Sequence, residues 1–180
     1  MRNFLLFSMS GESNSTQTFK KVYEAWFPLL FRIVYRMVGK REAAEEIVQE
    51  AFIKYYERRD QLPSDDGLKY WLIRVVRNLA LNHEKRRGRE RRALERVFHE
   101  PAPNQEAGAL QVIVGQEEKE AVQRALLILP AKMREVLVLK EYTDFSYAEI
   151  GKVLLITEGN VKVRVFRARA QLAKLLKEVL

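Results

Sequence analysis

Apolar residues recur at helical spacing along most of the chain, and the alternating pattern of a half-buried β-strand is scarce. In the first half this spacing predicts helices over residues 19–27, 28–38, 41–60 and 68–87. Pro28 suits the first turn of a helix and Gly39 suits a C-terminal cap, whereas LPSDDG at 62–67 is a turn-forming segment. We therefore expect an all-α protein that follows a polar, disordered leader at residues 1–18, in which Met1 and Met9 are both candidate starts.

The helical pattern is interrupted between residues 88 and 116, where Gly, Pro, Asn and Gln replace the apolar stripe. From residue 117 the helical spacing resumes, and Pro130 separates two further segments. The interruption predicts a flexible linker at 88–116 that joins two small helical domains, one at 19–87 and one at 117–180.

The C-terminal part carries the signals of two short helices joined by a tight turn. Ser146 and Glu149 have the spacing of a capping box, and Thr157 is placed to cap the helix that follows. In that helix Val161, Val165, Ala168 and Leu172 fall within one narrow arc, which predicts the core face. The pattern predicts a helix-turn-helix, although Leu155 stands where a left-handed Gly is usual, at a cost of about 1 kcal/mol.

The opposite face of the last helix combines apolar and cationic side chains. It holds Asn160, Lys162, Val163, Phe166 and Arg167, with Arg164 and Arg169 on its flanks. Helices that enter the major groove of DNA use apolar contacts with thymine methyl groups beside Lys or Arg on guanine edges, and flanking arginines hold phosphates. The alternative is an exposed, charged helix that carries one isolated Phe on its surface and does not bind DNA.

The predicted helix over 41–60 has an apolar and an acidic face. The apolar face consists of Ala44, Ile47, Val48, Ala51, Phe52 and Tyr55. The other face consists of Glu46, Gln49, Glu50, Ile53 and Glu57. An acidic face is unsuited to DNA, so it is either a solvated exterior or a docking surface for a basic protein partner.

The predicted helix over 68–87 carries side chains that are suited to binding unstacked bases. Its expected core positions are Leu68, Leu72, Val75 and Leu79, aided by Trp71 and Val76. We expect Tyr70, Arg74, Arg77 and Lys85 to point outward, with Asn78 and Asn82 on the flank. Aromatic rings stack on bases, amides bond to base edges and cations hold phosphate.

Composition narrows the classes of function. The net charge is +8, and two basic segments at 68–92 and 158–180 carry it, which favours two contacts with one long polyanion. The chain has no Cys and only His83 and His99, so thiolate chemistry is excluded, and we expect no metal, no cofactor and no enzymatic activity. No apolar run is long enough for a secretory signal or a membrane span, so we expect a cytoplasmic protein.

Taken in order, these segments resemble RNA polymerase sigma factors of the extracytoplasmic-function group, the minimal two-domain members of the sigma-70 family. REAAEEIVQEAFIKYYERRDQL at 41–62 is similar to the family's polymerase-binding helix, and YWLIRVVRNLALNHEKRRGR at 70–89 to its promoter-opening helix. The stretch from LPAKMREVLVLKEY to RARAQL, at 129–172, resembles the family's helix-turn-helix domain.

The resemblance implies partners and residue roles. The partners are core RNA polymerase, through its β′ clamp helices and the β flap, promoter DNA and an anti-sigma factor. Polymerase binding would fall to Glu46, Gln49, Glu50 and Ile53. Minus-10 recognition and melting would fall to Ser64, Asp65, Lys69, Tyr70, Arg74, Arg77, Asn78, Asn82 and Lys85. Minus-35 recognition would fall to Asn160, Lys162, Val163, Arg164, Phe166, Arg167 and Arg169.

The chain departs from the family pattern at Glu46, where Asp is usual, at Leu155 and at Val163, where a small polar residue is common. The alternative to a transcription initiation factor is a stand-alone helix-turn-helix regulator whose N-terminal half senses a ligand or dimerises. A nucleic-acid enzyme is disfavoured because the acidic residues lie on a solvated helical face without a partner His or Cys.

Overall fold

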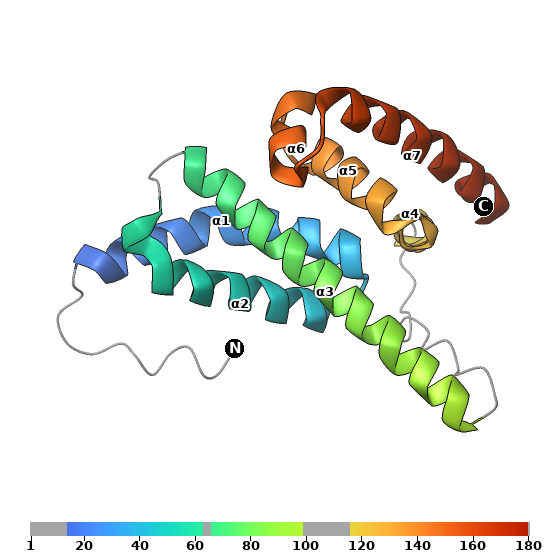
Figure 1. The fold of residues 1–180 in the computed structure, drawn as a ribbon, viewed down its shortest axis with the longest axis horizontal. Coiled ribbons are helices and arrows are strands. Elements are labelled where there is room, and N and C mark those ends of the chain that lie inside the picture. The colour runs from blue at the N-terminus through green and yellow to red at the C-terminus, as the bar shows by residue number, and fades with distance from the viewer. Residues whose placement is uncertain (1–13, 63–65, 99–115, 180) are drawn as a thin grey trace.

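The computed structural model describes residues 14–62, 66–98 and 116–179, and within these ranges every regular element is a helix. The helices are α1 (Asn14–Val38), α2 (Arg41–Arg58), the short 3-10 turn η2 (Arg59–Gln61), α3 (Asp66–Phe98), α4 (Gln116–Ile128), α5 (Ala131–Tyr142), α6 (Tyr147–Leu154) and α7 (Glu158–Val179). Figure 1 shows that α1–α3 form one helical group and that α4–α7 form a second group lying against it. The prediction of an all-α protein with two helical groups is confirmed.

Helix α1 is continuous through Pro28, so the predicted break between residues 27 and 28 is wrong. Proline inside a helix removes one backbone hydrogen bond and costs about 3 kcal/mol. Pro28 is exposed, while Leu30, Ile33 and Val34 in the following turns are fully buried, and the burial of this stripe offsets the cost. The helix also begins at Asn14, within the segment predicted as a disordered leader; residues 1–13 lie outside the described residues.

Helix α2 has the two faces that its sequence predicts. Its buried residues are Ala43, Ala44, Ile47, Val48, Ala51, Phe52 and Tyr55. They pack against α1 and α3, which together form the core of the N-terminal group. Gly39 joins α1 to α2 with a φ of +78°, a left-handed conformation that glycine adopts without strain.

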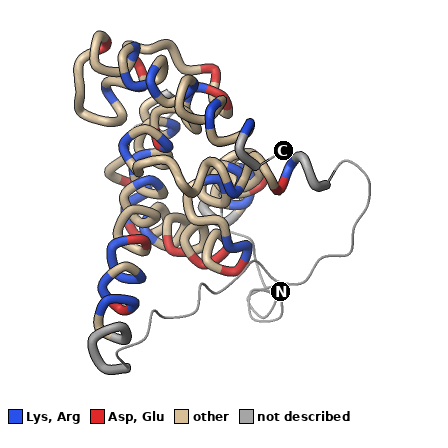
Figure 2. The backbone as a smooth tube through the Cα atoms, turned by 90° about the vertical axis from the view of Figure 1, so that its right-hand side faces the viewer, with Lys and Arg blue, Asp and Glu red and all other residues tan. Residues whose placement is uncertain are grey.

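Helix α3 continues to Phe98, eleven residues beyond the predicted end at 87, so the first part of the predicted linker is helical. Gly88 disfavours helix by about 1 kcal/mol, but its neighbours are mostly Arg and Glu, which favour helix, and Arg86 pairs with Glu90 one turn on. The C-terminal half of α3 extends past the other helices as a basic arm, at the lower end of Figures 1 and 2. The rest of the predicted linker, 99–115, lies outside the described residues.

The core face of α3 differs in part from its prediction. Leu72 and Val76 are fully buried as expected, but Val75 and Leu79 are only half-buried, and Ile73 is fully buried instead. The reason is that α3 packs against α1 and α2 on one side and against α6 on another. A helix covered on two sides buries residues outside a single stripe.

In the C-terminal group, α7 packs on α4, α5 and α6. The arc predicted for its core face is confirmed, because Val161, Val165 and Ala168 are buried and Leu172 packs beside them. The buried residues of α5, α6 and α7 are continuous with the core of the N-terminal group. Phe145, in the loop between α5 and α6, is fully buried in this shared core.

Candidate nucleic-acid and protein interfaces

Helices α6 and α7 form the helix-turn-helix, and its local details follow the sequence. The side chain of Ser146 accepts a hydrogen bond from the backbone N–H of Glu149 at 3.2 Å, and Glu149 Oε2 accepts one from the N–H of Ser146 at 2.7 Å, which completes the predicted capping box. Thr157 Oγ1 accepts a hydrogen bond from the N–H of Asn160, which caps α7 as predicted. These bonds fix where both helices begin.

The turn between α6 and α7 contains the one left-handed residue other than glycine in the described part of the chain. Leu155 has φ 58° and ψ 45°, and its side chain is 79% exposed. The N–H of Ile156 donates to the carbonyl of Gly151 at 3.0 Å. A Cβ at Gly151 would lie 2.7 Å from the carbonyl oxygen of Ile156, so the tightness of this turn depends on glycine at position 151.

The outer face of α7 is solvent-exposed and mixed in chemistry. Phe166 is 75% exposed and Val163 is 47% exposed, and Asn160, Lys162 and Arg167 are exposed beside them. Because Phe166 and Val163 are exposed, they do not contribute to the hydrophobic core. Together with the flanking cations they form a surface suited to the base edges of the major groove.

Two arginines of the predicted minus-35 set lie differently from the others. Arg164 is half-buried and points towards Glu135 of α5, at 3.9 Å, so it is not on the exposed face. Arg169 is exposed but forms an ion pair with Glu141 at 2.7 Å, and this hydrogen bond raises its pKa. Lys162 forms a similar pair with Glu158 at 2.7 Å, which raises the pKa of the lysine. A DNA phosphate would compete with these carboxylates for Lys162 and Arg169.

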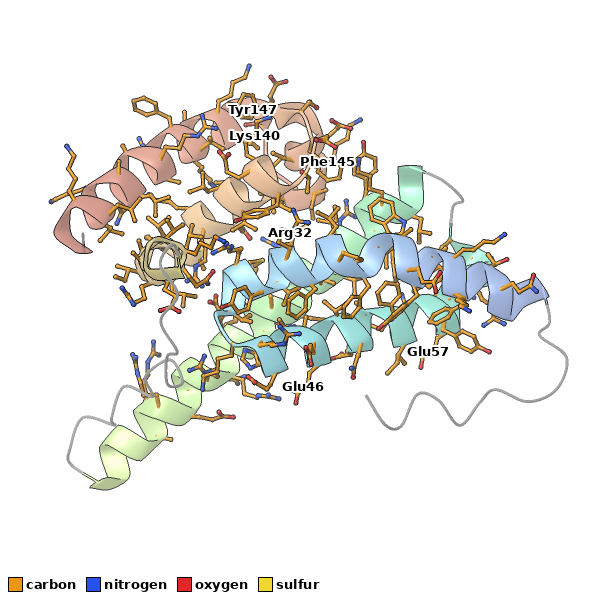
Figure 3. All side chains as sticks on the ribbon, turned by 180° about the vertical axis from the view of Figure 1, so that it is seen from behind. Arg32, Glu46, Glu57, Lys140, Phe145 and Tyr147 are labelled. Atoms are coloured by element: carbon orange, nitrogen blue, oxygen red, sulfur yellow. The ribbon has the colours of Figure 1, made fainter. Side chains whose placement is uncertain are left out.

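The acidic face of α2 is exposed, and it also contains apolar side chains. Glu46, Gln49 and Glu50 are exposed, and Ile53 is 56% exposed. Figure 3 shows Glu46 and Glu57 on the side of α2 that faces away from the C-terminal group. Tyr56, one turn further on, is 48% exposed, so the two side chains form a small apolar patch beside the carboxylates, which suits a protein-binding surface.

The residues of α3 predicted to point outward are divided between solvent and the C-terminal group. Asn78, Asn82 and Lys85 are exposed as expected. Ser64 and Asp65 lie outside the described residues.

Tyr70, Arg74 and Arg77 are half-buried against the C-terminal group, so the expectation that they point freely outward is wrong. The Tyr70 hydroxyl donates to Glu149 of α6, and Arg74 Nη2 donates to the carbonyl of Lys152 at 2.8 Å. Arg77 forms an ion pair with Glu135 of α5 at 2.8 Å. The C-terminal group covers the face on which the sequence placed base contacts.

The Tyr70 ring lies against Phe145, with 5.0 Å between the ring centroids. Lys69, also in the predicted minus-10 set, lies over the same Phe145 ring, with its Nζ 4.6 Å from the centroid. The aromatic side of this α3 face is therefore also occupied by the C-terminal group.

Sequence reasoning missed the buried polar residues between the two helical groups. Arg134 of α5 is buried, pairs with Glu84 of α3 and donates to the carbonyl of Met37 in α1. Gln123 of α4 accepts from Arg36 Nη1 at 2.9 Å. The only signal was a charged pair, Arg134 and Glu135, within the apolar run of α5, and a sequence does not show which distant residues such a pair meets.

Family models match both helical groups. Residues 22–90 match the model described as Sigma-70 region 2, and residues 119–172 match the model described as Sigma-70, region 4. Both helical groups are thus those of sigma-70 class proteins.

Individual relatives agree with these matches. The chain is 30% identical over 173 residues to the ECF RNA polymerase sigma factor SigW of Bacillus subtilis strain 168, covering 89% of this chain and 90% of the relative. It is 32% identical to the ECF RNA polymerase sigma-E factor of Escherichia coli K12, covering 69% of each chain. The solved structure of the sigma factor RpoE in complex with the anti-sigma factor NepR, from Bartonella quintana, is 28% identical, with a TM-score of 0.70 over 89% of this chain and 98% of that one.

The chain belongs to the extracytoplasmic-function group of RNA polymerase sigma factors. It is a transcription initiation factor that directs the polymerase to promoters, and the alternative of a stand-alone regulator is not favoured. Sigma factors are initiation factors rather than enzymes. Among the described residues, no helix has the length and apolar character to cross a membrane.

Proposed function

We propose that α7 reads the minus-35 element through its exposed face. Phe166 and Val163 would contact thymine methyl groups, and Lys162 and Arg167 would bind guanine edges or phosphates. Asn160, at the first turn of α7, would contact the adjoining bases, and Arg169 would hold a phosphate after leaving Glu141. The observation that carries this proposal is the 75% exposure of Phe166 on the outer face of a capped helix-turn-helix.

We propose that α2 binds core RNA polymerase through Glu46, Gln49, Glu50 and Ile53, on the β′ clamp helices. The exposed carboxylates would meet a basic partner surface, and Ile53 would supply the apolar contact at its centre. The helix-turn-helix group would bind the β flap, so that the polymerase holds both groups of helices at once. This requires the protein to act in the cytoplasm, where the polymerase is.

We further propose that α3 reads and melts the minus-10 element. Asn78, Asn82 and Lys85 are accessible for this, and Ser64 and Asp65 in the preceding segment would capture a flipped base. Lys69, Tyr70, Arg74 and Arg77 would join them once the C-terminal group moves away. Arg164 would remain a structural partner of Glu135 unless that ion pair opens.

An anti-sigma factor is proposed as a regulatory partner. The support is the similarity to RpoE, a sigma factor whose structure was solved in complex with the anti-sigma factor NepR.

The test of the proposed function is run-off transcription with purified core polymerase on a pool of genomic fragments, followed by sequencing of the transcript starts. Discrete starts that share two upstream motifs and disappear without the protein are expected. Charge reversal by Glu50→Lys should abolish binding to core polymerase, whereas Glu24→Lys, on the exposed side of α1, is the matched control and should not. Equal polymerase binding by both variants would refute the role of α2.

A further inference from the structure

The face of α3 proposed to contact minus-10 DNA is already occupied by the chain's own C-terminal group. Tyr70, Arg74 and Arg77 lie along one side of α3 at spacings of four and three residues, so they share a face. Each of the three donates a hydrogen bond to α5 or α6. Helix α6 packs directly against α3.

The groups that cover this face resemble DNA in chemistry. Glu149 and Glu135 present carboxylates to Tyr70 and Arg77, where phosphates would otherwise lie, and the carbonyl of Lys152 accepts from Arg74. The Phe145 ring packs on Tyr70 and under the Lys69 ammonium, as an unstacked base would. The same α3 side chains therefore cannot bind these groups and DNA at the same time.

The contacts that cover this face of α3 are polar, while elsewhere the two helical groups share buried apolar residues such as Phe145. Separation of the groups therefore exposes apolar surface, and the binding of both groups to the polymerase would have to offset that cost. Arg74 Nε is buried and finds no hydrogen-bond partner among the described residues, so the closed arrangement leaves one cationic N–H unsatisfied. A phosphate would satisfy it, which gives DNA an advantage at this position.

The closed arrangement covers α3 selectively. Phe166 and Val163 on α7 and Ile53 on α2 stay exposed. The surfaces proposed for minus-35 DNA and for polymerase are thus available while the proposed minus-10 face is covered.

We propose that the free protein inhibits itself through an interdomain latch, formed by Tyr70 with Glu149, Arg74 with the carbonyl of Lys152, Arg77 with Glu135, and Arg134 with Glu84. The latch shields the DNA-binding face of α3 until the two helical groups separate. This inference rests on the proposed role of α3 in DNA binding. It makes separation of the groups a required step before promoter melting.

The first experiment measures the closed state without DNA. Because the chain has no Cys, cysteines at the exposed positions Glu57 on α2 and Lys174 on α7 accept two spin labels without background, and electron paramagnetic resonance gives the distance between them. A single narrow distance is expected for the otherwise native chain. A broad distribution in that chain would overturn the latch.

The variant that opens the latch is Glu149→Gln combined with Glu84→Gln. Gln keeps the capping box with Ser146 but loses the charge-assisted bond from Tyr70, and the second change removes the partner of Arg134. The open population should rise about tenfold, as a broader and longer distance distribution. Glu45→Gln combined with Glu120→Gln is the matched control, since it removes the same number of charges and breaks only the ion pairs with Arg41 within α2 and with Arg124 within α4.

The second experiment measures access to α3 with a fluorescent single-stranded DNA of random sequence, 20 nucleotides long by design, at one fixed salt concentration. The variant that opens the latch should bind it several-fold more tightly than the native chain, and the control with Glu45→Gln and Glu120→Gln should not. A narrow distance retained in the variant with Glu149→Gln and Glu84→Gln, with circular dichroism showing an intact fold, would overturn the latch. Opening without any gain in DNA affinity would support the latch and refute the proposed DNA contacts of α3 instead.

Discussion

Leu155 offers a direct test of how this helix-turn-helix is built. Its φ of 58° and ψ of 45° are left-handed, a conformation that costs a residue with a Cβ about 1–2 kcal/mol. The side chain is 79% exposed, so little apolar burial is lost when it is removed. Glycine relieves the strain, but it increases the entropy of the unfolded chain at a cost of about 0.4–1 kcal/mol. We therefore expect Leu155→Gly to stabilise the folded protein by about 0.5–1 kcal/mol.

Leu155→Ala is the matched control, because it removes the side chain beyond Cβ and keeps the strain. Its free energy of unfolding should stay within about 0.5 kcal/mol of the native value. The assay is urea unfolding followed by circular dichroism, with a thermal melt as the second measurement. In a chain of this length the Gly variant should raise Tm by about 1–4 °C. A Gly variant no more stable than the Ala variant would refute the assignment of strain to this residue.

The remaining predictions concern the helix-turn-helix and its contact with Tyr70 of α3. Gly151→Ala should destabilise the protein by about 1–3 kcal/mol in urea unfolding, since the new Cβ would lie 2.7 Å from the Ile156 carbonyl oxygen; unchanged stability would mean that the turn relaxes freely. The hydrogen bond from the Tyr70 hydroxyl, followed by those from Ser146, lowers the pKa of Glu149 to about 2. Because the folded pKa is depressed, its stabilising effect is present above the unfolded pKa near 4.5 and is lost as pH falls towards 2. Carboxyl titration by NMR should show Glu149 ionised at pH 3 and a higher pKa in Tyr70→Phe; an identical pKa in that variant would contradict the contact. Arg167→Ala should cost about 1–3 kcal/mol of binding at the preferred minus-35 sequence and less at others, and an equal loss on all sequences would make Arg167 a phosphate contact.

The features predicted correctly from the sequence are those set by neighbouring residues. The capping box of Ser146 and Glu149 needs only residues three apart, and the buried arc of Val161, Val165 and Ala168 needs only the period of one helix. Even the unusual Leu155 was placed correctly, because the position of the turn follows from the two helices around it. Local rules therefore predicted most of the helix-turn-helix.

The errors arose where local signals compete with packing. Pro28 and Gly88 are helix-breaking residues, and each led to a predicted helix boundary that the structure does not have. At Pro28 the burial of the α1 stripe outweighs a lost hydrogen bond, and at Gly88 the surrounding helix-forming residues outweigh one unfavourable position. A single residue with a cost of 1–3 kcal/mol ends a helix only when little else favours continuing it.

The α3 face shows why a binding surface is easier to predict than its occupant. Arg74 and Arg77 need acceptors for their guanidinium donors, and Tyr70 needs one for its hydroxyl. DNA phosphates meet that need, and so do Glu135, Glu149 and a main-chain carbonyl of the same chain. The periodic pattern of the sequence therefore identifies the face, whereas the choice of partner depends on contacts between residues 58 to 79 positions apart, which the pattern does not contain. A sigma factor that uses one set of donors for both partners must exchange the internal partner for DNA, so the strength of the internal contacts sets how readily α3 becomes available to the promoter.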